Sequence, residues 1–398
     1  MHALDIVQRF VESHLQLMHA ARRAVLAQAV AAVMQGHYVS LTRIARALAG
    51  CVRLKAAIKR IDRLIGNGRI EQEARLVGAL LLEQLSKLSG PLVIVVDWSA
   101  VNPGSSFVEL RAAVSYPGMG RALTLYQQVY PQWQLGNCKI ECALLDQLHS
   151  WLDGHNEVIV VTDAGFRRPW FAHVEALGWR WVGRVRRGVS LGAPSKQAAG
   201  GWCWQGLSGW FAQANGRAKR ISNCLLSKAG NWPCEVVLVR RRVVGRKSYR
   251  CPGYGSTPKA AHEARQSAKE PWLLVHSSAL NGYRPEQIVA FYAARMQIEE
   301  CFRDNKSLRF GMGQELGRSR SALRLHALLL IATLASFLMW HMGQLAEAEG
   351  LHHHFKATTR VRRELSLISL ARLICTFAPT HLSEFAIHAL FTRLEIRQ

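Results

Sequence analysis

Acidic residues are scarce in this chain. The sequence has 27 Asp and Glu residues against 51 Lys and Arg residues, so its formal net charge at pH 7 is +24. Self-repulsion of that size destabilises a compact protein unless a polyanion is its working partner. The balance therefore favours nucleic acid as the partner, with an anionic membrane as the alternative.

A long hydrophobic run is also absent. The most apolar run has 14 residues, from Ala327 to Trp340, whereas a helix needs about 20 residues to cross a bilayer. We interpret this run as a buried core helix. The first residues carry Asp5 and Glu12 within an apolar pattern, which is unlike a secretory signal peptide. We therefore expect a cytoplasmic protein without a membrane partner.

Paired cysteine motifs are missing as well. The nine cysteines are odd in number, and no two of them have the C-x-x-C spacing typical of zinc and redox sites. We interpret them as reduced packing residues. The tract His352–His354 is interpreted as a solvated polar turn, with metal binding as the alternative.

The first 75 residues predict short helices. Of these, 41–48 and 53–65 resemble a helix-turn-helix, with Ser40 as a plausible N-cap. The second helix is expected to bury Leu54, Ile58, Ile61 and Ile65 and to expose the basic residues Arg53, Lys59, Arg60 and Arg63. With 12 basic and 5 acidic residues, this segment is predicted to bind DNA. The alternative is an ordinary helical bundle with a solvated basic face.

From residue 91 the pattern changes to that of strands. The run Leu92–Val96 is rich in β-branched residues, which predicts a strand buried on both faces. The predicted elements are strands at 92–96, 107–114 and 123–130, a helix at 140–152, a strand at 158–162, a helix at 171–177 and a strand at 179–185. This β-β-β-α-β-α-β order is typical of a ribonuclease-H-like domain.

Two aspartates follow apolar strand runs. Asp97 comes directly after Leu92–Val96, and Asp163 comes directly after Val158–Thr162. Such strands can place both carboxylates at the carboxyl edge of one sheet, where α/β proteins usually build their sites. Like charges held close together are costly unless divalent cations neutralise them. The pair therefore predicts a metal site, and the alternative is that each Asp is a solvated turn residue.

A third carboxylate, Glu299, lies in a predicted helix that begins at Pro285. The residues Tyr292, Arg295, Glu299, Arg303 and Lys306 follow at steps of 3, 4, 4 and 3, which puts them on one helix face. Glu300 and Asp304 point roughly 100 to 140° away from Glu299 at 3.6 residues per turn. The alternative is a salt-bridged surface helix. Three carboxylates in these settings are what a two-metal phosphoryl-transfer site requires.

The segment 188–270 interrupts the strand and helix pattern. It has 14 basic residues against 3 acidic ones, and its densest charge includes Arg240, Arg241 and Arg242. We interpret it as a β-rich insertion that faces a phosphate backbone, with a solvated hairpin as the alternative.

These motifs resemble those of a known family. The pattern Tyr292-x2-Arg295-x3-Glu299-x6-Lys306 matches the Y-R-E-K signature of the insertion sequence 4 family of DDE transposases. Asp97-Trp-Ser99 and Thr162-Asp-Ala-Gly-Phe166 resemble the two aspartate motifs of that family. The resemblance covers about residues 90–310.

The resemblance implies a cut-and-paste enzyme that binds terminal inverted repeats. Asp97, Asp163 and Glu299 would hold two Mg²⁺ or Mn²⁺ ions, and Tyr292, Arg295 and Lys306 would grip phosphates near the transposon end. Arg303 is a further expected DNA contact on the same helix face. Trp272 would stack on a base flipped out during hairpin formation, and a core tryptophan is the alternative. A homodimer in the DNA complex and a bacterial, nucleoid-associated location are also implied.

The predicted fold is therefore α/β, with a ribonuclease-H-like core interrupted by a β-rich insertion and flanked by helical N- and C-terminal domains. The predicted parts are a DNA-binding domain (1–75), the core in two pieces (76–187 and 271–320), the insertion (188–270) and a helical C-terminal domain (321–398) that packs internally or forms a dimer. Two other functions stay open: a metal-dependent nuclease that only cuts, and a catalytically silent DNA-binding protein descended from a transposase.

Overall fold

The computed structural model describes residues 3–48, 52–86, 90–102, 104, 106–115, 120–152, 157–186, 188–198, 200–241, 270–309, 311–359 and 364–377. Arg242 lies outside the described residues. The fold is mixed α/β, and the chain divides into two compact units. The first unit contains residues 1–156 and 296–398, and the second contains residues 157–295.

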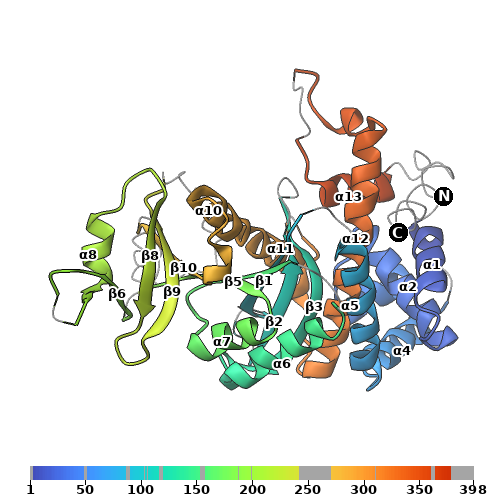
Figure 1. Cartoon of the computed structure of the whole chain (residues 1–398). Coiled ribbons are helices and arrows are strands. Elements are labelled where there is room, and N and C mark those ends of the chain that lie inside the picture. The colour runs from blue at the N-terminus through green and yellow to red at the C-terminus, as the bar shows by residue number, and fades with distance from the viewer. Residues whose placement is uncertain are drawn as a thin grey trace. The chain divides into compact units, whose positions relative to one another are not determined.

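Helices make up the N-terminal part of the first unit (Figure 1). They are α1 (Ala3–His14), α2 (Ala20–Met34), α3 (Leu41–Ala47), α4 (Leu54–Ile65) and α5 (Ile70–Ser86). Helix α4 packs against α2, α3 and α12 through Ala57, Ile61, Leu64 and Ile65. Leu54 is 42% exposed, so the prediction that it is buried is wrong. Leu54 begins the helix, and the packing face starts one turn later.

The first unit also contains three antiparallel strands in the order β3-β2-β1. They are β1 (Leu92–Ala100), β2 (Phe107–Val114) and β3 (Leu123–Pro131), which confirms the three predicted strands. Strand β1 does not end at Asp97, because its pairing with β2 continues to the partners Ala100 and Val108. A 3₁₀ turn η1 (Gln132–Gln134) and helix α6 (Cys138–His149) follow, and the Asn137 side chain caps α6 by accepting from the Lys139 amide at 3.0 Å.

The last part of the chain returns to the first unit. It consists of α11 (Met296–Lys306), η3 (Gln314–Leu316), α12 (Ala322–Ala348), η4 (Leu351–Phe355) and α13 (Leu367–Phe377). Helix α12 packs against α2, α5, α13 and β3, and it is apolar around its whole circumference, which is the pattern of a helix buried in a core.

Among the described residues, α12 is long and apolar enough to cross a membrane by length and composition. The predicted apolar run therefore belongs to a longer helix of 27 residues, so its shortness does not exclude a membrane span. The residues of its most apolar window are 78% buried inside the protein. The prediction of a buried core helix is thus confirmed by packing rather than by length.

The second unit is built on a sheet with the strand order β4-β5-β10-β9-β8-β6-β7. Its strands are β4 (Val158–Thr162), β5 (Arg180–Arg184), β6 (Ser190–Pro194), β7 (Trp202–Gly206), β8 (Lys219–Leu226), β9 (Trp232–Val239) and β10 (Trp272–His276). Strands β4 and β5 are parallel, and α7 (Arg168–Ala176) lies between them in the sequence. The other helical elements are α8 (Leu207–Ala212), η2 (Ser278–Leu280) and α10 (Pro285–Ala294).

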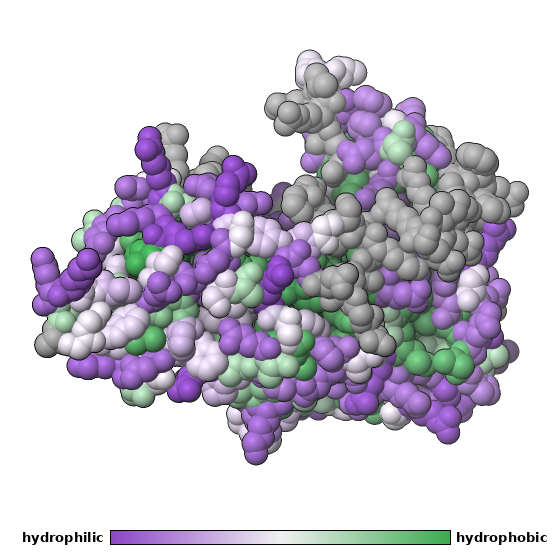
Figure 2. Space-filling model, in the orientation of Figure 1, coloured by the Kyte–Doolittle hydropathy of each residue, from purple (hydrophilic) through white to green (hydrophobic). Residues whose placement is uncertain are grey.

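The sheet of the second unit is larger than the sequence pattern indicates. The sequence predicts a clear strand in 188–241 only at 235–240, whereas four strands lie there. This segment has seven basic residues and one acidic residue, Glu235, which is buried. Figure 2 shows many hydrophilic residues over β8 and its neighbours.

The predicted single helix from Pro285 to Lys306 is wrong in one respect, because it consists of two helices. At Arg295 the backbone amide bonds to the carbonyl of Tyr292 at 3.1 Å, so the chain tightens into a 3₁₀ turn there. Helix α10 belongs to the second unit and α11 to the first. Tyr292 thus lies in the first helix, Arg295 at its C-cap and Glu299 in the second helix. The predicted boundaries at 75, 187, 270 and 320 do not coincide with the division into units, and the predicted parts themselves stay predictions.

Candidate active site

In the first unit, the Asp97 strand carries several polar side chains on one face. Asp97 lies directly opposite Arg111 in the register of β1 and β2, and Ser99 lies directly opposite Glu109. Directly opposite residues of an antiparallel pair point to the same side of the sheet, as do residues two apart in one strand. Asp97, Ser99, Glu109 and Arg111 therefore share one face.

Helix α11 packs on β1 and β3 and contacts that polar face. The Lys306 ammonium donates to the Ser99 hydroxyl at 2.5 Å and lies 3.9 Å from Glu109 Oε1. The Lys306 side chain is 17% exposed, and burial lowers its pKa although Glu109 acts in the opposite direction. The helix that carries Glu299 is thereby attached to the strand that carries Asp97.

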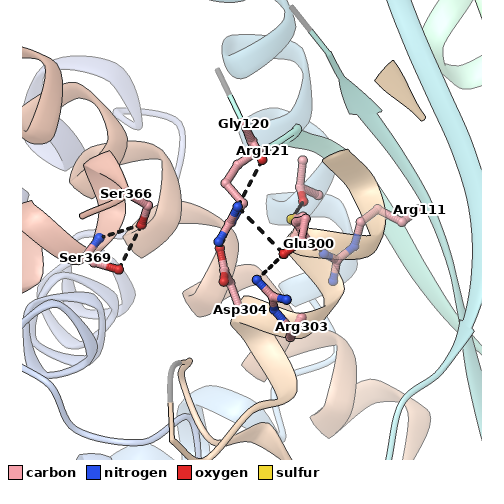
Figure 3. Close-up of polar contacts among 10 residues, drawn as sticks. Arg111, Gly120, Arg121, Glu300, Arg303, Asp304, Ser366 and Ser369 are labelled. Carbon is pink, nitrogen blue, oxygen red and sulfur yellow. Dashed lines mark hydrogen bonds and ion pairs between the residues drawn. The ribbon is translucent and has the colours of Figure 1, made fainter. Parts of the chain in front are cut away.

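The other two acidic residues of α11 are held in ion pairs (Figure 3). Arg121 donates from Nε to Asp304 Oδ2 at 2.5 Å, and its Nη1 lies 3.7 Å from Glu300 Oε2. Arg303 forms a second ion pair with Glu300. Glu300 and Asp304 thus share one cluster of ion pairs with Arg121 and Arg303.

In the second unit, Asp163 follows directly after β4 and is surrounded by donors. Tyr292 donates its hydroxyl to Asp163 Oδ1 at 2.9 Å. Two guanidinium groups face Oδ2, Arg186 at 3.4 Å and Arg295 at 3.9 Å. Tyr292 and Arg295 are 2% and 5% exposed, so they fix the Asp163 carboxylate from inside the protein.

These donors change the acidity of the groups involved. Burial raises the pKa of Asp163, but the charges of Arg295 and Arg186 together with hydrogen bonds outweigh it, so the pKa lies below its ordinary value. Burial and the Asp163 charge raise the pKa of Tyr292 to about 12. At neutral pH the pair is therefore a carboxylate that accepts a hydrogen bond from a protonated phenol.

The lowered pKa predicts a change of stability in acid. Asp163 stabilises the metal-free fold above its unfolded-state pKa of about 3.9, and this contribution is lost as the pH falls through the lower folded-state pKa. We expect the melting-temperature difference between the wild type and Asp163→Asn to be largest above about pH 5 and to shrink below about pH 4. Thermal unfolding from neutral to acid pH measures it. A difference that stays constant over this range would contradict the role of the ion pairs.

Trp272 lies next to this group in the second unit. Its ring meets Tyr292 edge-on at 4.9 Å between centroids, with an interplanar angle of 79°. The Arg241 guanidinium lies over the Trp272 ring, 4.7 Å from its centroid. Trp272 is half-buried at the first position of β10.

The other predicted DNA contacts lie on the surface. Arg53, Lys59, Arg60 and Arg63 are all exposed on α4 or at its N-cap. Arg240 is exposed but bound to the carbonyls of Phe211 and Ala214, at 3.0 and 3.3 Å. The Arg303 side chain is 56% exposed beside Glu300. These positions stay predictions as DNA contacts.

Among the described residues, no group of three or more His, Cys, Asp or Glu side chains that could hold a metal ion is found. Asp97 and Glu299 belong to the first unit and Asp163 to the second. Carboxylate oxygens are the ligands that Mg²⁺ and Mn²⁺ prefer, so the donor chemistry of these residues fits such ions.

Sequence reasoning missed Glu109, Arg111 and Arg186. Glu109 and Arg111 interrupt the otherwise apolar strand Phe107–Val114 at alternate positions, and both are completely buried. Two charged residues on the buried face of a strand were a usable signal, since such residues are almost never fully buried unless they are paired. Arg186 had no comparable signal, because it follows β5 in a basic stretch.

Comparison with known proteins identifies the family of this chain. A search of curated proteins finds no match. The family model described as transposase DDE domain matches residues 136–337, which is more than half of the chain. The matched range includes Asp163 and Glu299, and Asp97 lies before it. Such a domain implies a ribonuclease-H-like fold, DNA as partner and the use of divalent metal ions. With this match, the chain belongs to the transposase DDE domain family.

Proposed function

We propose that the chain is a transposase of the insertion sequence 4 family. It binds the terminal inverted repeats of an insertion sequence, cleaves the DNA ends by two-metal phosphoryl transfer and joins them to target DNA. The observation that carries the proposal is the packing of the Glu299 helix on the Asp97 strand in a chain of the DDE family. The Y-R-E-K pattern gives further support.

Asp97, Asp163 and Glu299 are the residues that would hold two Mg²⁺ or Mn²⁺ ions. When bound, such ions activate water or a 3′-hydroxyl and stabilise the leaving oxygen at phosphorus. Tyr292 and Arg295 hold the Asp163 carboxylate in one orientation and keep it ionised. The proposal requires Asp163 to meet Asp97 and Glu299 in the active complex.

The aromatic and basic residues of the second unit serve the DNA. Trp272 takes a flipped base beside the scissile bond, which supports cleavage through a hairpin. Arg241 adds positive charge over the same ring. Lys306, Arg303 and the basic segment 188–241 neutralise phosphates of the transposon end.

The exposed basic residues of α4 supply the grip on the terminal repeats. End binding by α4 is thereby separate from the chemistry of the carboxylates. The net charge of +24 favours such binding to DNA. A homodimer brings two ends together in the DNA complex, and the site of action is the nucleoid in a bacterial cytoplasm.

One assay separates this function from its two alternatives. Purified protein is incubated with linear DNA that bears candidate element ends, with Mg²⁺ or with a chelator. We expect joined products with Mg²⁺ and binding alone with the chelator. Nicking without joining would indicate a metal-dependent nuclease, and binding without any cleavage would indicate a silent DNA-binding protein.

A further inference from the structure

A completely buried ion pair lies beneath the Glu299 helix. The Arg111 Nη2 donates to Glu109 Oε2 at 2.8 Å, and both side chains are 0% exposed. Replacing a buried ion pair by apolar residues of similar volume is often neutral or stabilising, because both charges lose their water. The Glu109–Arg111 pair therefore adds little to the stability of the fold. Its presence in an otherwise apolar strand suggests another role.

The pair reaches the helix through Arg111. Its Nη1 contacts the Cys301 sulfur at 3.1 Å, and its guanidinium lies 4.5 Å from the centroid of the Phe302 ring. Figure 3 shows Arg111 extending from its strand toward the helix that carries Glu300 and Arg303. Cys301 and Phe302 are the second and third residues after Glu299, so Arg111 holds the turn of α11 next to the candidate metal ligand.

Glu109 reaches the same helix one turn further on. Its second oxygen, Oε1, lies 3.9 Å from the Lys306 ammonium, which also donates to Ser99 and lies 5.0 Å from the Phe302 ring centroid. The Phe302 ring is therefore contacted by two cations, Arg111 and Lys306. The helix is therefore held at two points along its length, by the Arg111–Cys301 contact and by the contacts of Lys306 with Ser99 and Glu109.

The pair is also tied to Asp97 through the sheet. Arg111 is the register partner of Asp97, and Glu109 is the register partner of Ser99. Side chains directly opposite in an antiparallel pair have Cβ atoms about 4.5–5.5 Å apart. Arg111 and Glu109 thus pair in the sheet with Asp97 and Ser99, and both also contact the helix that carries Glu299.

We propose that Glu109 and Arg111 are positioning residues that set Glu299 relative to Asp97 for metal binding. This inference rests on the proposed function of the two carboxylates. Apolar packing holds a helix against a sheet but tolerates small slides and rotations, whereas a guanidinium bound to a carboxylate and a thiol does not. A displacement of about 1 Å at a catalytic group can cost roughly 10²-fold in rate.

The test is the double variant Glu109→Leu/Arg111→Met of the full chain, which removes the charges but keeps the volume. The matched control is Arg22→Met/Glu73→Leu, because Arg22 and Glu73 form a largely buried ion pair between α2 and α5 in the same unit. Three quantities are measured for each protein: the melting temperature with and without Mn²⁺, the affinity for a DNA end without metal, and the rate of end cleavage.

We expect the Glu109→Leu/Arg111→Met variant to melt near the wild-type temperature without metal and to bind the DNA end normally. Its half-saturating Mn²⁺ concentration for thermal stabilisation should rise about 10- to 100-fold, as for other residues that orient metal ligands. Cleavage at low Mn²⁺ should fall by a similar factor and recover partly at high Mn²⁺. The control should keep the wild-type response to Mn²⁺.

An unchanged Mn²⁺ response in the Glu109→Leu/Arg111→Met variant would overturn the inference, as would a wild type that Mn²⁺ does not stabilise. Where the double variant unfolds, Arg111→Lys keeps a buried cation at the same place, and an unchanged Mn²⁺ response there would also overturn it. Failure of the proposed function gives a different result: the wild type and the control bind Mn²⁺ but produce neither cleaved nor joined DNA.

Discussion

Glu299→Gln is expected to lower the rate of DNA-end cleavage by about 10³-fold or more and to leave metal-free end binding within about twofold. The substitution keeps the size of the side chain and removes its charge. A metal ion contributes several kcal/mol of transition-state stabilisation, and each 1.4 kcal/mol corresponds to about tenfold in rate. End binding persists because it is assigned to the exposed basic residues of α4. Gel shifts and single-turnover cleavage measure the two effects.

Glu300→Gln is the matched control for this prediction. Glu300 is the next residue on the same helix and loses the same charge, but it pairs with Arg121 and Arg303, and its side chain is 32% exposed. A partly exposed ion pair stabilises the fold by only about 0–1 kcal/mol. We therefore expect the rate of cleavage to change by less than about fivefold. If Glu300→Gln removed cleavage and Glu299→Gln did not, the assignment of the third carboxylate would be wrong.

Arg111→Met is expected to lower the free energy of unfolding of the first unit by about 3–5 kcal/mol. The substitution leaves the Glu109 carboxylate buried, with the Lys306 ammonium 3.9 Å away. An uncompensated buried charge is far more costly than the loss of an exposed one. Calorimetric unfolding at neutral pH measures the loss.

The matched control for this change is Arg121→Met, which also removes an arginine that contacts α11. The Arg121 side chain is 20% exposed, whereas that of Arg111 is 0% exposed, so the loss of Arg121 should cost clearly less than that of Arg111. Restoring stability by adding Glu109→Leu to Arg111→Met is the second half of the prediction. If Arg111→Met and Arg121→Met lowered the free energy of unfolding equally, burial of the Glu109–Arg111 pair would not be the cause of the loss.

The strands and helices around the carboxylates were predictable because their patterns are local. The β-branched runs before Asp97 and Asp163 and the helical spacing in 140–149 need no knowledge of distant residues. The parallel pair β4 and β5 follows from the helix that separates them in the sequence. It could therefore be predicted that Asp97 and Asp163 lie in or directly after a strand and that Glu299 lies in a helix.

The contacts that tune these residues depend on distant parts of the chain. The strand β1 runs past Asp97 because β2 offers partners as far as Val108, which the sequence of β1 alone does not reveal. The break at Arg295 is invisible to a periodicity argument, since helical residues lie on both sides of it. The donors around Asp163 come from residues 23 to 132 positions later in the chain.

Most strands of the basic segment 188–241 could not be predicted from the sequence, for a different reason. Its short strands β6, β7 and β8 are rich in Gly, Ser and Trp and lack a clear alternation of apolar and polar residues. Strand β8 pairs with β9, β6 pairs with β8, and β7 pairs with β6. Such strands are stabilised by their neighbours more than by their own propensity.

The proposed metal site is tested most directly by an experimental structure of the protein bound to a DNA end in the presence of Mn²⁺, with the ions located by anomalous scattering. We expect Mn²⁺ coordinated by the carboxylates of Asp97, Asp163 and Glu299, next to the scissile phosphate. Mn²⁺ held by other residues, or three carboxylates too far apart to share ions while DNA is bound, would show that this site is wrong.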